Sequence, residues 1–117
     1  MTDLPFPRRG HIYRVQIPGE PGQKSRPALV LSPDVRNRLA SDVIVVPLSS
    51  HLRAAPTHVW LRPREGGLPR ASVVKAEQIT TLPRDRLSPR PLGGPLAAHR
   101  LLAVEKAVLR SIGVPVE

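Results

Sequence analysis

The chain has no cysteine, very few aromatic residues and no long apolar run, and each shortage excludes a class of protein. Because its 117 residues include no Cys, disulfides, thiolate catalysis and cysteine-ligated metal sites are excluded. No stretch approaches the roughly 20 apolar residues that span a bilayer, and the N-terminal sequence MTDLPFPRRG lacks the apolar core of a signal peptide. We therefore expect a cytoplasmic protein with no membrane partner.

Acidic residues are scarce beside basic ones. The chain has 9 Asp and Glu against 18 Lys and Arg, which gives a formal net charge of +9, and 15 of the 18 cations are arginine. Such an excess favours a polyanionic partner, because the planar guanidinium donates in a fork that suits phosphate. An arginine-rich and proline-rich composition is equally typical of a GC-rich genome, so the charge alone leaves both interpretations open.

Short apolar runs bounded by Pro, Gly and Ser dominate the first two-thirds of the chain and predict strands. In the first run Tyr13, Val15 and Ile17 occupy alternate positions, which is the period of a strand with one buried face. We find no repeat or linker, so residues 1–117 are expected to form one domain. The predicted strands are 11–17, 28–32, 42–49, 57–61 and 71–76.

Near the C-terminus the apolar period changes to that of a helix. Ala97, Leu101, Val104, Val108 and Ile112 fall on one stripe at spacings of three and four. This pattern predicts an amphipathic helix from about residue 94 to residue 112. Short strands followed by one helix indicate a small, strongly bent sheet or barrel, with the helix covering an open side.

Several kinds of chemistry lack the residues they need. The four histidines, His11, His51, His58 and His99, show no metal-ligand spacing, so we expect no metal. No serine lies in a nucleophile elbow, and GEPGQKS lacks the spacing of a phosphate-binding loop. What remains is a set of polar residues at strand ends, which a small barrel could bring together. The alternative is that they are ordinary surface residues, with Glu77 paired to an arginine.

Six segments together resemble a known family. RGHIY (9–13), KSRPALVLSPD (24–34), VIVVPLSS (43–50), PTHVWL (56–61), SVVKAEQITTLPRDRL (72–87) and the C-terminal helix have the order and spacing of the MazF/PemK family of toxin endoribonucleases. The resemblance extends from residue 9 to about residue 113. It implies a mainly β, SH3-like barrel of the CcdB/MazF/PemK type with a C-terminal α-helix.

The resemblance also implies a function and partners. It implies metal-independent cleavage of single-stranded RNA without a cofactor, a homodimer, and a cognate antitoxin whose acidic, disordered tail occupies the RNA groove. We expect strand residues around Val46, and the helix or loops beside them, at the dimer interface. Trp60 is expected in the core or at that interface rather than as a platform for a base.

The family's functional positions fall on particular residues of this chain. Arg26 and Ser49 match the catalytic arginine and the catalytic threonine or serine, and a guanidinium suits stabilisation of the phosphorane. His51 is the candidate acceptor for the 2′-hydroxyl proton, because imidazole titrates near neutrality. The positions expected to bind RNA are Lys24, Ser50, His51, His58, Lys75, Glu77, Gln78 and Arg84.

The chain departs from the family pattern at three positions, and two other functions remain open. Pro21 interrupts the first loop, Thr80 stands where the family often has an arginine, and Ser49 replaces the commoner threonine. One alternative is a non-catalytic toxin of the same fold that inhibits a protein, as gyrase-directed CcdB relatives do. The other is a basic nucleic-acid-binding module. The pairing of Arg26 with Ser49 favours the nuclease.

Overall fold

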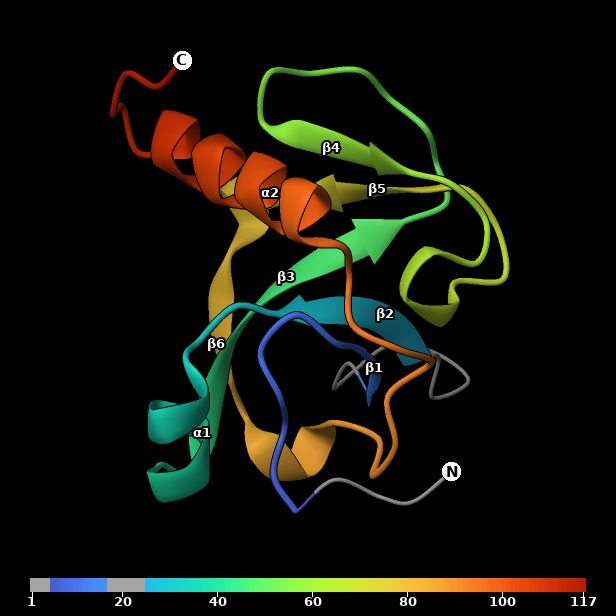
Figure 1. Cartoon of the computed structure of the whole chain (residues 1–117), viewed down its shortest axis with the longest axis vertical. Helices are drawn as coiled ribbons and strands as arrows, with labels where there is room; N and C mark the ends of the chain where they lie inside the picture. Colours follow the sequence, from blue (N-terminus) through green and yellow to red (C-terminus); the bar gives the residue numbers. More distant parts are fainter. Residues whose placement is uncertain (1–4, 17–24) are drawn as a thin grey trace.

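The computed structural model describes residues 5–16 and 25–117. Within these ranges one sheet holds six antiparallel strands, and a C-terminal helix lies against one end of it (Figure 1). The strands are β1 (Ile12–Gln16), β2 (Ser25–Val30), β3 (Asp42–Ser49), β4 (His58–Leu61), β5 (Ser72–Lys75) and β6 (Thr80–Pro83). The helices are α1 (Asp34–Leu39) and α2 (Ala98–Ser111), and the 3-10 turns are η2 (Glu65–Gly67), η3 (Ala76–Gln78) and η4 (Arg84–Arg86). None of the helices in these ranges is long and apolar enough to cross a bilayer.

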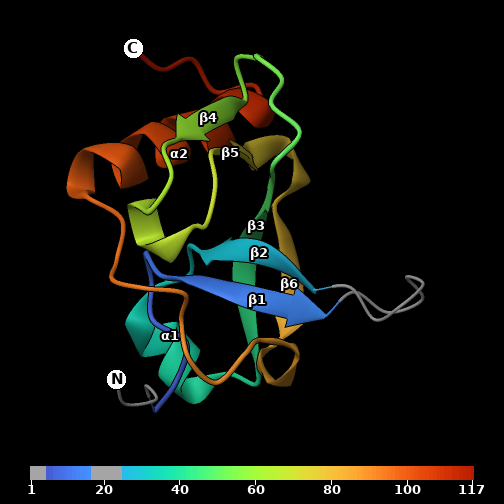
Figure 2. The ribbon, with the colours of Figure 1, turned by 90° about the vertical axis from the view of Figure 1, so that its right-hand side faces the viewer.

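β3 is the central strand and divides the sheet into two halves. The strand order is β1-β2-β3-β5-β4, with β6 also paired to β3. The first part of β3 pairs with β6, and its last two residues pair with β5. Since η3 separates β5 from β6, these two short strands share one edge of β3 and diverge from each other, which bends the sheet strongly (Figure 2).

The chain after η4 returns to the free edge of β1. A single bridge joins Val15 to Leu87, and the backbone N–H of Ser88 donates to the Arg14 carbonyl at 2.8 Å. Irregular chain therefore covers this edge, and within residues 5–16 and 25–117 no continuous ladder closes the barrel. The expected fold class, a mainly β, SH3-like architecture with a C-terminal helix, is confirmed in this partly open form.

Each face of the sheet carries an apolar cluster. One cluster lies under α2 and includes Ile12, Leu48 and Val104, and the other includes Tyr13 and Val15. The expectation that β1 buries only one face is therefore wrong at Ile12, which is fully buried because α2 and its flanking chain cover the second face. Ile17 lies outside the described residues. Val46 itself is fully buried in the α2 cluster, so a dimer interface formed by the strand residues around it and by the helix or loops beside it stays a prediction.

The C-terminal helix is shorter at its start than its sequence stripe predicts. The structure begins α2 at Ala98 and ends it at Ser111. Before it, the backbone N–H of Leu96 donates to the Gly10 carbonyl at 2.9 Å, so the chain there is still fastened beside the N-terminal segment. Gly113, with a φ of 87°, turns the chain just past the end of α2.

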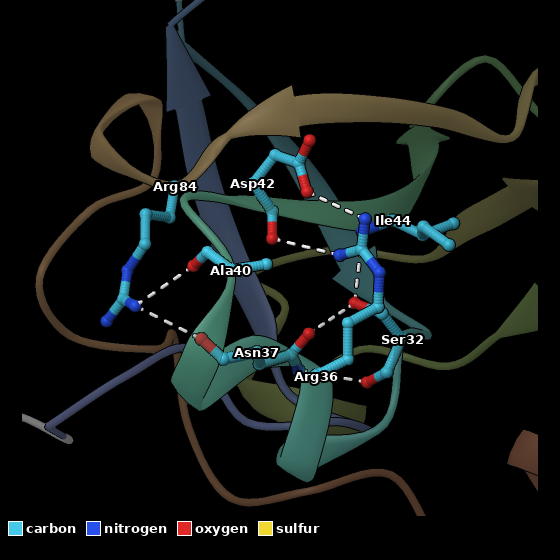
Figure 3. Close-up of polar contacts among 7 residues, drawn as sticks. All are labelled: Ser32, Arg36, Asn37, Ala40, Asp42, Ile44 and Arg84. Carbon is cyan, nitrogen blue, oxygen red and sulfur yellow. Dashed lines mark hydrogen bonds and ion pairs between the residues drawn. The ribbon is translucent and has the colours of Figure 1, made fainter.

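The sequence analysis does not predict helix α1, because polar contacts rather than an apolar stripe hold this helix (Figure 3). Asn37 is fully buried, and its side-chain amide donates to the Ser32 carbonyl at 2.9 Å. The Ser32 hydroxyl donates to the Asn37 side-chain oxygen and accepts from the backbone N–H of Ile44 at 3.0 Å. Arg36 donates to the Asp42 carboxylate at 2.7 Å. This network fixes the start of β3, the strand that carries Ser49 at its other end.

Candidate active site

β2 and β3 separate at one end, and the space between them is the first candidate site. Their pairing ends at Ala28 opposite Pro47. β2 continues to Ser25 as a partner of β1, whereas β3 continues to Ser49 as a partner of β5. Between the diverging strands lies a hollow of about 380 Å³, called here the fork hollow. Its lining includes Ser25, Arg26, Ser49, Ser50, His51 and Arg70.

Arg26 and Ser49 reach the fork hollow from opposite sides. Arg26 lies on β2 opposite Val15 and is exposed, and Pro27 follows it as a restrained strand residue. Ser49 ends β3, and its hydroxyl oxygen accepts from the backbone N–H of His51 at 3.0 Å. This contact fixes the serine oxygen and leaves its own hydrogen available for donation. The two positions matched to catalytic residues thus line one hollow.

Strand register places further candidates on the same face as Ser49. Ser49 is opposite Val73, and Val73 is opposite Trp60, so the three form one row across β3, β5 and β4. His58 and Lys75 form the next row on that face. The alternate positions enter the core under α2, so this face points away from α2. Trp60 is 48% exposed, so the expectation that it belongs to the core is wrong, and its place at a dimer interface stays a prediction.

A second hollow, of about 530 Å³, adjoins the fork hollow and is called here the β4 hollow. His51 lines both hollows and so forms part of their common wall. The β4 hollow brings together four of the residues expected to bind RNA, in addition to the shared His51. These are His58, Lys75, Glu77 and Gln78.

Glu77 is fastened to the start of β4 instead of to an arginine. Its carboxylate accepts from the Thr57 hydroxyl at 2.8 Å and lies 3.3 Å from Nε2 of His58, while Nδ1 of His58 lies 2.7 Å from the Arg53 carbonyl oxygen. Burial raises the pKa of Glu77, but hydrogen bonds from Thr57, from its own backbone N–H and from His58 outweigh burial and lower this pKa below its usual value. The carboxylate therefore holds the 50–57 loop against η3.

The structure places one expected RNA-binding residue away from these hollows and does not describe another. Lys24 falls outside the described residues. Arg84 lines neither hollow, and its guanidinium donates to the carbonyls of Asn37 and Ala40 at 3.1 and 3.3 Å (Figure 3). It also donates to the Pro5 carbonyl at 3.3 Å. Arg84 uses these donors to hold α1 and the N-terminal segment, and its expected role in RNA binding stays a prediction.

Sequence reasoning also missed residues that the fork hollow contains. Arg14 lines the hollow because the register of β1 and β2 places it opposite Pro27, the residue after Arg26. Arg70 lines the hollow too, and it follows η2, which packs tightly against the chain near residue 92. Gly67 has a φ of 88°, and a Cβ added there would lie 2.3 Å from the Leu92 backbone. Exposed alternation on β1 is a signal that could have found Arg14, but nothing local in the sequence marks Arg70. No group of three potential metal-ligating side chains occurs within 5–16 and 25–117.

Comparison with known proteins agrees with this geometry. Residues 8–112 match the family model described as "PemK-like, MazF-like toxin of type II toxin-antitoxin system". The chain is 30% identical over 109 residues to endoribonuclease MazF4 of Mycobacterium tuberculosis, an alignment that covers 93% of this chain and 95% of the relative. It is 33% identical over 86 residues to endoribonuclease EndoA of Bacillus subtilis, covering 69% and 74%.

Solved structures give the same assignment. A mycobacterial endoribonuclease in complex with its cognate antitoxin has a TM-score of 0.77 and 31% identity, covering 95% of this chain and 99% of the other. A MazE–MazF complex from Deinococcus radiodurans has a TM-score of 0.76 and 25% identity, covering 94% and 98%. The chain belongs to the PemK-like, MazF-like family of toxins of type II toxin–antitoxin systems.

Proposed function

We propose that this toxin, an endoribonuclease by its family, cleaves single-stranded RNA in the fork hollow, with the 2′-hydroxyl of the RNA as the nucleophile and without a metal ion. The observation that carries the proposal is the divergence of β2 from β3. It places Arg26 and Ser49 on opposite sides of one hollow, at the two positions that the family resemblance marks as catalytic.

The reaction has three requirements, and the fork hollow offers a group for each. The 2′-hydroxyl must lose a proton, the phosphorus must carry extra negative charge, and the 5′-oxygen must gain a proton as it leaves. The Arg26 guanidinium can donate two parallel hydrogen bonds to the phosphorane oxygens. The Ser49 hydroxyl, whose oxygen already accepts from His51, can donate to a third oxygen or toward the leaving group.

His51 is the side chain that we assign as proton acceptor. It is exposed and lines both the fork hollow and the β4 hollow. Glu77 is the weaker choice, because its hydrogen bonds lower the pKa of its carboxyl and occupy both of its oxygens. A carboxylate with a lowered pKa accepts a proton less readily.

A cleavage assay in EDTA tests this proposal. The purified protein is incubated with a labelled single-stranded RNA and with the same RNA carrying 2′-deoxy nucleotides. We expect defined fragments with 2′,3′-cyclic phosphate and 5′-hydroxyl ends from the RNA, and no cleavage at the 2′-deoxy positions. Binding without cleavage would support the nucleic-acid-binding module, and neither binding nor cleavage would support the inhibitor of a protein target.

The proposal extends to partners. Relatives include a mycobacterial endoribonuclease solved with its cognate antitoxin and MazE–MazF complexes. We infer that this chain likewise has an antitoxin, whose acidic segment competes with RNA for the fork hollow. The basic lining supports this, since Arg14, Arg26 and Arg70 attract carboxylates as well as phosphates. We further infer that the toxin acts as a homodimer in the cytoplasm.

A further inference from the structure

A third hollow continues the fork hollow on the other side of β1. It has a volume of about 380 Å³ and is called here the η4 hollow. Its lining includes Arg14, Gln16, Ser25, Asp85, Arg86 and Ser88. Arg14 and Ser25 line the fork hollow as well, just as His51 is shared by the fork hollow and the β4 hollow. The three hollows therefore lie next to one another with the fork hollow in the middle, and this row is called here the track.

The fold explains why η4 borders this track. The bridge between Val15 and Leu87 places the turn η4 at the outer edge of β1 (Figure 2). The Ser88 hydroxyl accepts from the backbone N–H of Arg14 at 3.1 Å, which holds the chain after η4 against the strand. Arg14 is exposed on β1 between the two hollows. The junction between the fork hollow and the η4 hollow is therefore held by the Val15–Leu87 bridge and by the contact from the Arg14 backbone to the Ser88 hydroxyl.

The charge along the track is positive from end to end. Lys75 and Arg53 line the β4 hollow, Arg26 and Arg70 the fork hollow, Arg14 the junction and Arg86 the η4 hollow. Glu77 and Asp85 are the opposing carboxylates. Four other arginines that pair with carboxylates lie off the track. These are Arg8, Arg9, Arg36 and Arg100.

The track suits a nucleic acid backbone better than a folded protein surface. None of the large apolar side chains that are exposed in the described structure, such as Trp60, Leu39 or Leu102, lines any of the three hollows. An arginine such as Arg86 offers a planar set of donors for phosphate oxygens. Small barrels that bind single strands contact roughly 4–16 nucleotides, so one hollow alone would be a short site.

We propose that the η4 hollow binds phosphates of the RNA strand that flanks the cleaved bond, on the side opposite the β4 hollow. The inference rests on the proposed function, because it takes the fork hollow as the point of cleavage. Arg86 then binds substrate without touching the reacting atoms. Arg86 therefore increases the affinity for RNA that is long enough to reach the η4 hollow, and this increase depends on the salt concentration.

The test compares Arg86→Ala with a charge-matched control, Arg38→Ala, on RNAs of two lengths. Arg38 is exposed on α1 and lines none of the three hollows. RNAs of both lengths share the sequence in which cleavage is tested. The shorter RNA is made in two forms, each of which lacks one flank. For the long RNA we expect Arg86→Ala to raise KM about tenfold, as for one lost charge-assisted hydrogen bond, with kcat changed less than twofold. The dependence of log KM on log salt should weaken by about 0.7.

Trimming one particular flank should bring Arg86→Ala and Arg38→Ala to the same KM, whereas trimming the other flank should not. Arg86→Lys should recover most of the affinity, because the salt-dependent term follows the charge. An equal KM for both variants on the long RNA would overturn the inference, as would a penalty that remains both when the one flank is trimmed and when the other is trimmed. Weaker inhibition by polyglutamate with unchanged RNA kinetics would also overturn it and would make the η4 hollow a site for an acidic peptide.

The same experiment keeps the two proposals apart. If the wild-type protein cleaves neither RNA, the proposed function fails, and the η4 hollow is then judged by the affinity of the uncleaved RNAs for wild type and for Arg86→Ala. If the wild-type protein cleaves both RNAs but Arg86→Ala behaves as Arg38→Ala does, only the inference about the η4 hollow fails.

Discussion

Arg26 is the residue on which cleavage should depend most directly. We expect Arg26→Ala to abolish cleavage and leave the melting temperature almost unchanged, since Arg26 is exposed on β2. Arg26→Lys should recover little activity, because one ammonium cannot reproduce the two parallel hydrogen bonds of a guanidinium. Single-turnover rates and thermal melts measure the two effects, with Arg38→Ala as the control for lost charge. Wild-type rates in Arg26→Ala would show that the assignment is wrong.

Ser49 should contribute through its hydroxyl alone. Removing one donor from a charge-stabilising site commonly costs about 2–4 kcal/mol of transition-state stabilisation, so Ser49→Ala should lower kcat by roughly two to three orders of magnitude. Ser49→Thr keeps the hydroxyl and should remain active. The threonine variant is also the control for the contact to the His51 backbone N–H, which a threonine oxygen can accept and alanine cannot. Equal rates for the alanine and threonine variants would remove Ser49 from the mechanism.

His51 should shape the dependence of the rate on pH. Only the neutral form of an imidazole accepts a proton. If His51 takes the 2′-hydroxyl proton, the wild-type rate falls toward acid pH, and His51→Ala loses both rate and this acid limb. Glu77→Gln is the comparison, because it alters the adjoining hollow without removing the imidazole. An unchanged profile in His51→Ala would leave water or another group as the acceptor.

At the level of elements, local pattern predicted more than long-range pairing. The apolar runs and the helical stripe predicted the strands that appear as β1 to β5 and the helix α2, because burial imposes those periods. β6 and α1 escaped prediction, since β6 is short and mostly exposed and α1 depends on the buried Asn37 network. The residues of the fork hollow show the same difference between local pattern and long-range pairing. Arg26 and Ser49 could be named from their segments, whereas Arg14 and Arg70 depend on register and on the packing of Gly67, which no single segment encodes.

The turn η2 is held to α2 by an ion pair that should make stability depend on pH. Glu65 accepts from Arg100 at 2.9 Å and from the Arg62 backbone N–H at 2.6 Å. Burial raises the pKa of Glu65, but these hydrogen bonds and the two arginine charges outweigh burial and lower it below its ordinary 4.5. A lowered pKa means that the stabilisation is complete above the unfolded-state pKa and is lost as pH falls through the folded-state value.

We therefore expect Glu65→Gln to reduce the free energy of unfolding by about 1 kcal/mol or less at pH 7, the range of a partly exposed pair. The difference from wild type should shrink as the pH falls below about 4.5. Urea titrations at pH 7 and pH 3.5 measure it, with Glu117→Gln, an exposed carboxyl at the chain end, as the control. A difference in unfolding free energy that grows at acid pH would show that folding does not lower the pKa of Glu65.

On the scale of the whole molecule, the basic track and the exposed apolar side chains of α2 occupy different parts of the surface. The face of β3, β5 and β4 that carries Ser49 points away from α2. On α2, Leu102 and Leu109 are 50% and 36% exposed and stand two turns apart on one side. A second subunit that packs on α2 would therefore bury apolar surface without covering the fork hollow.

We expect two copies of the chain in solution at micromolar concentration, joined through α2, an interface that would leave Trp60 outside because Trp60 lies on the face that points away from α2. Burying Leu102 and Leu109 against the same side chains of a second copy would remove apolar surface from water, at roughly 25 cal/mol for each Å², and a self-complementary helix face suits a two-fold dimer. Sedimentation velocity measures the assembly. Leu102→Glu should shift it to the monomer, because two carboxylates would meet at the two-fold axis. Leu39→Glu, a change at a 78% exposed position on α1, is the control and should leave the dimer intact. A wild-type protein that is strictly monomeric and still cleaves RNA would show that the toxin works without a second subunit.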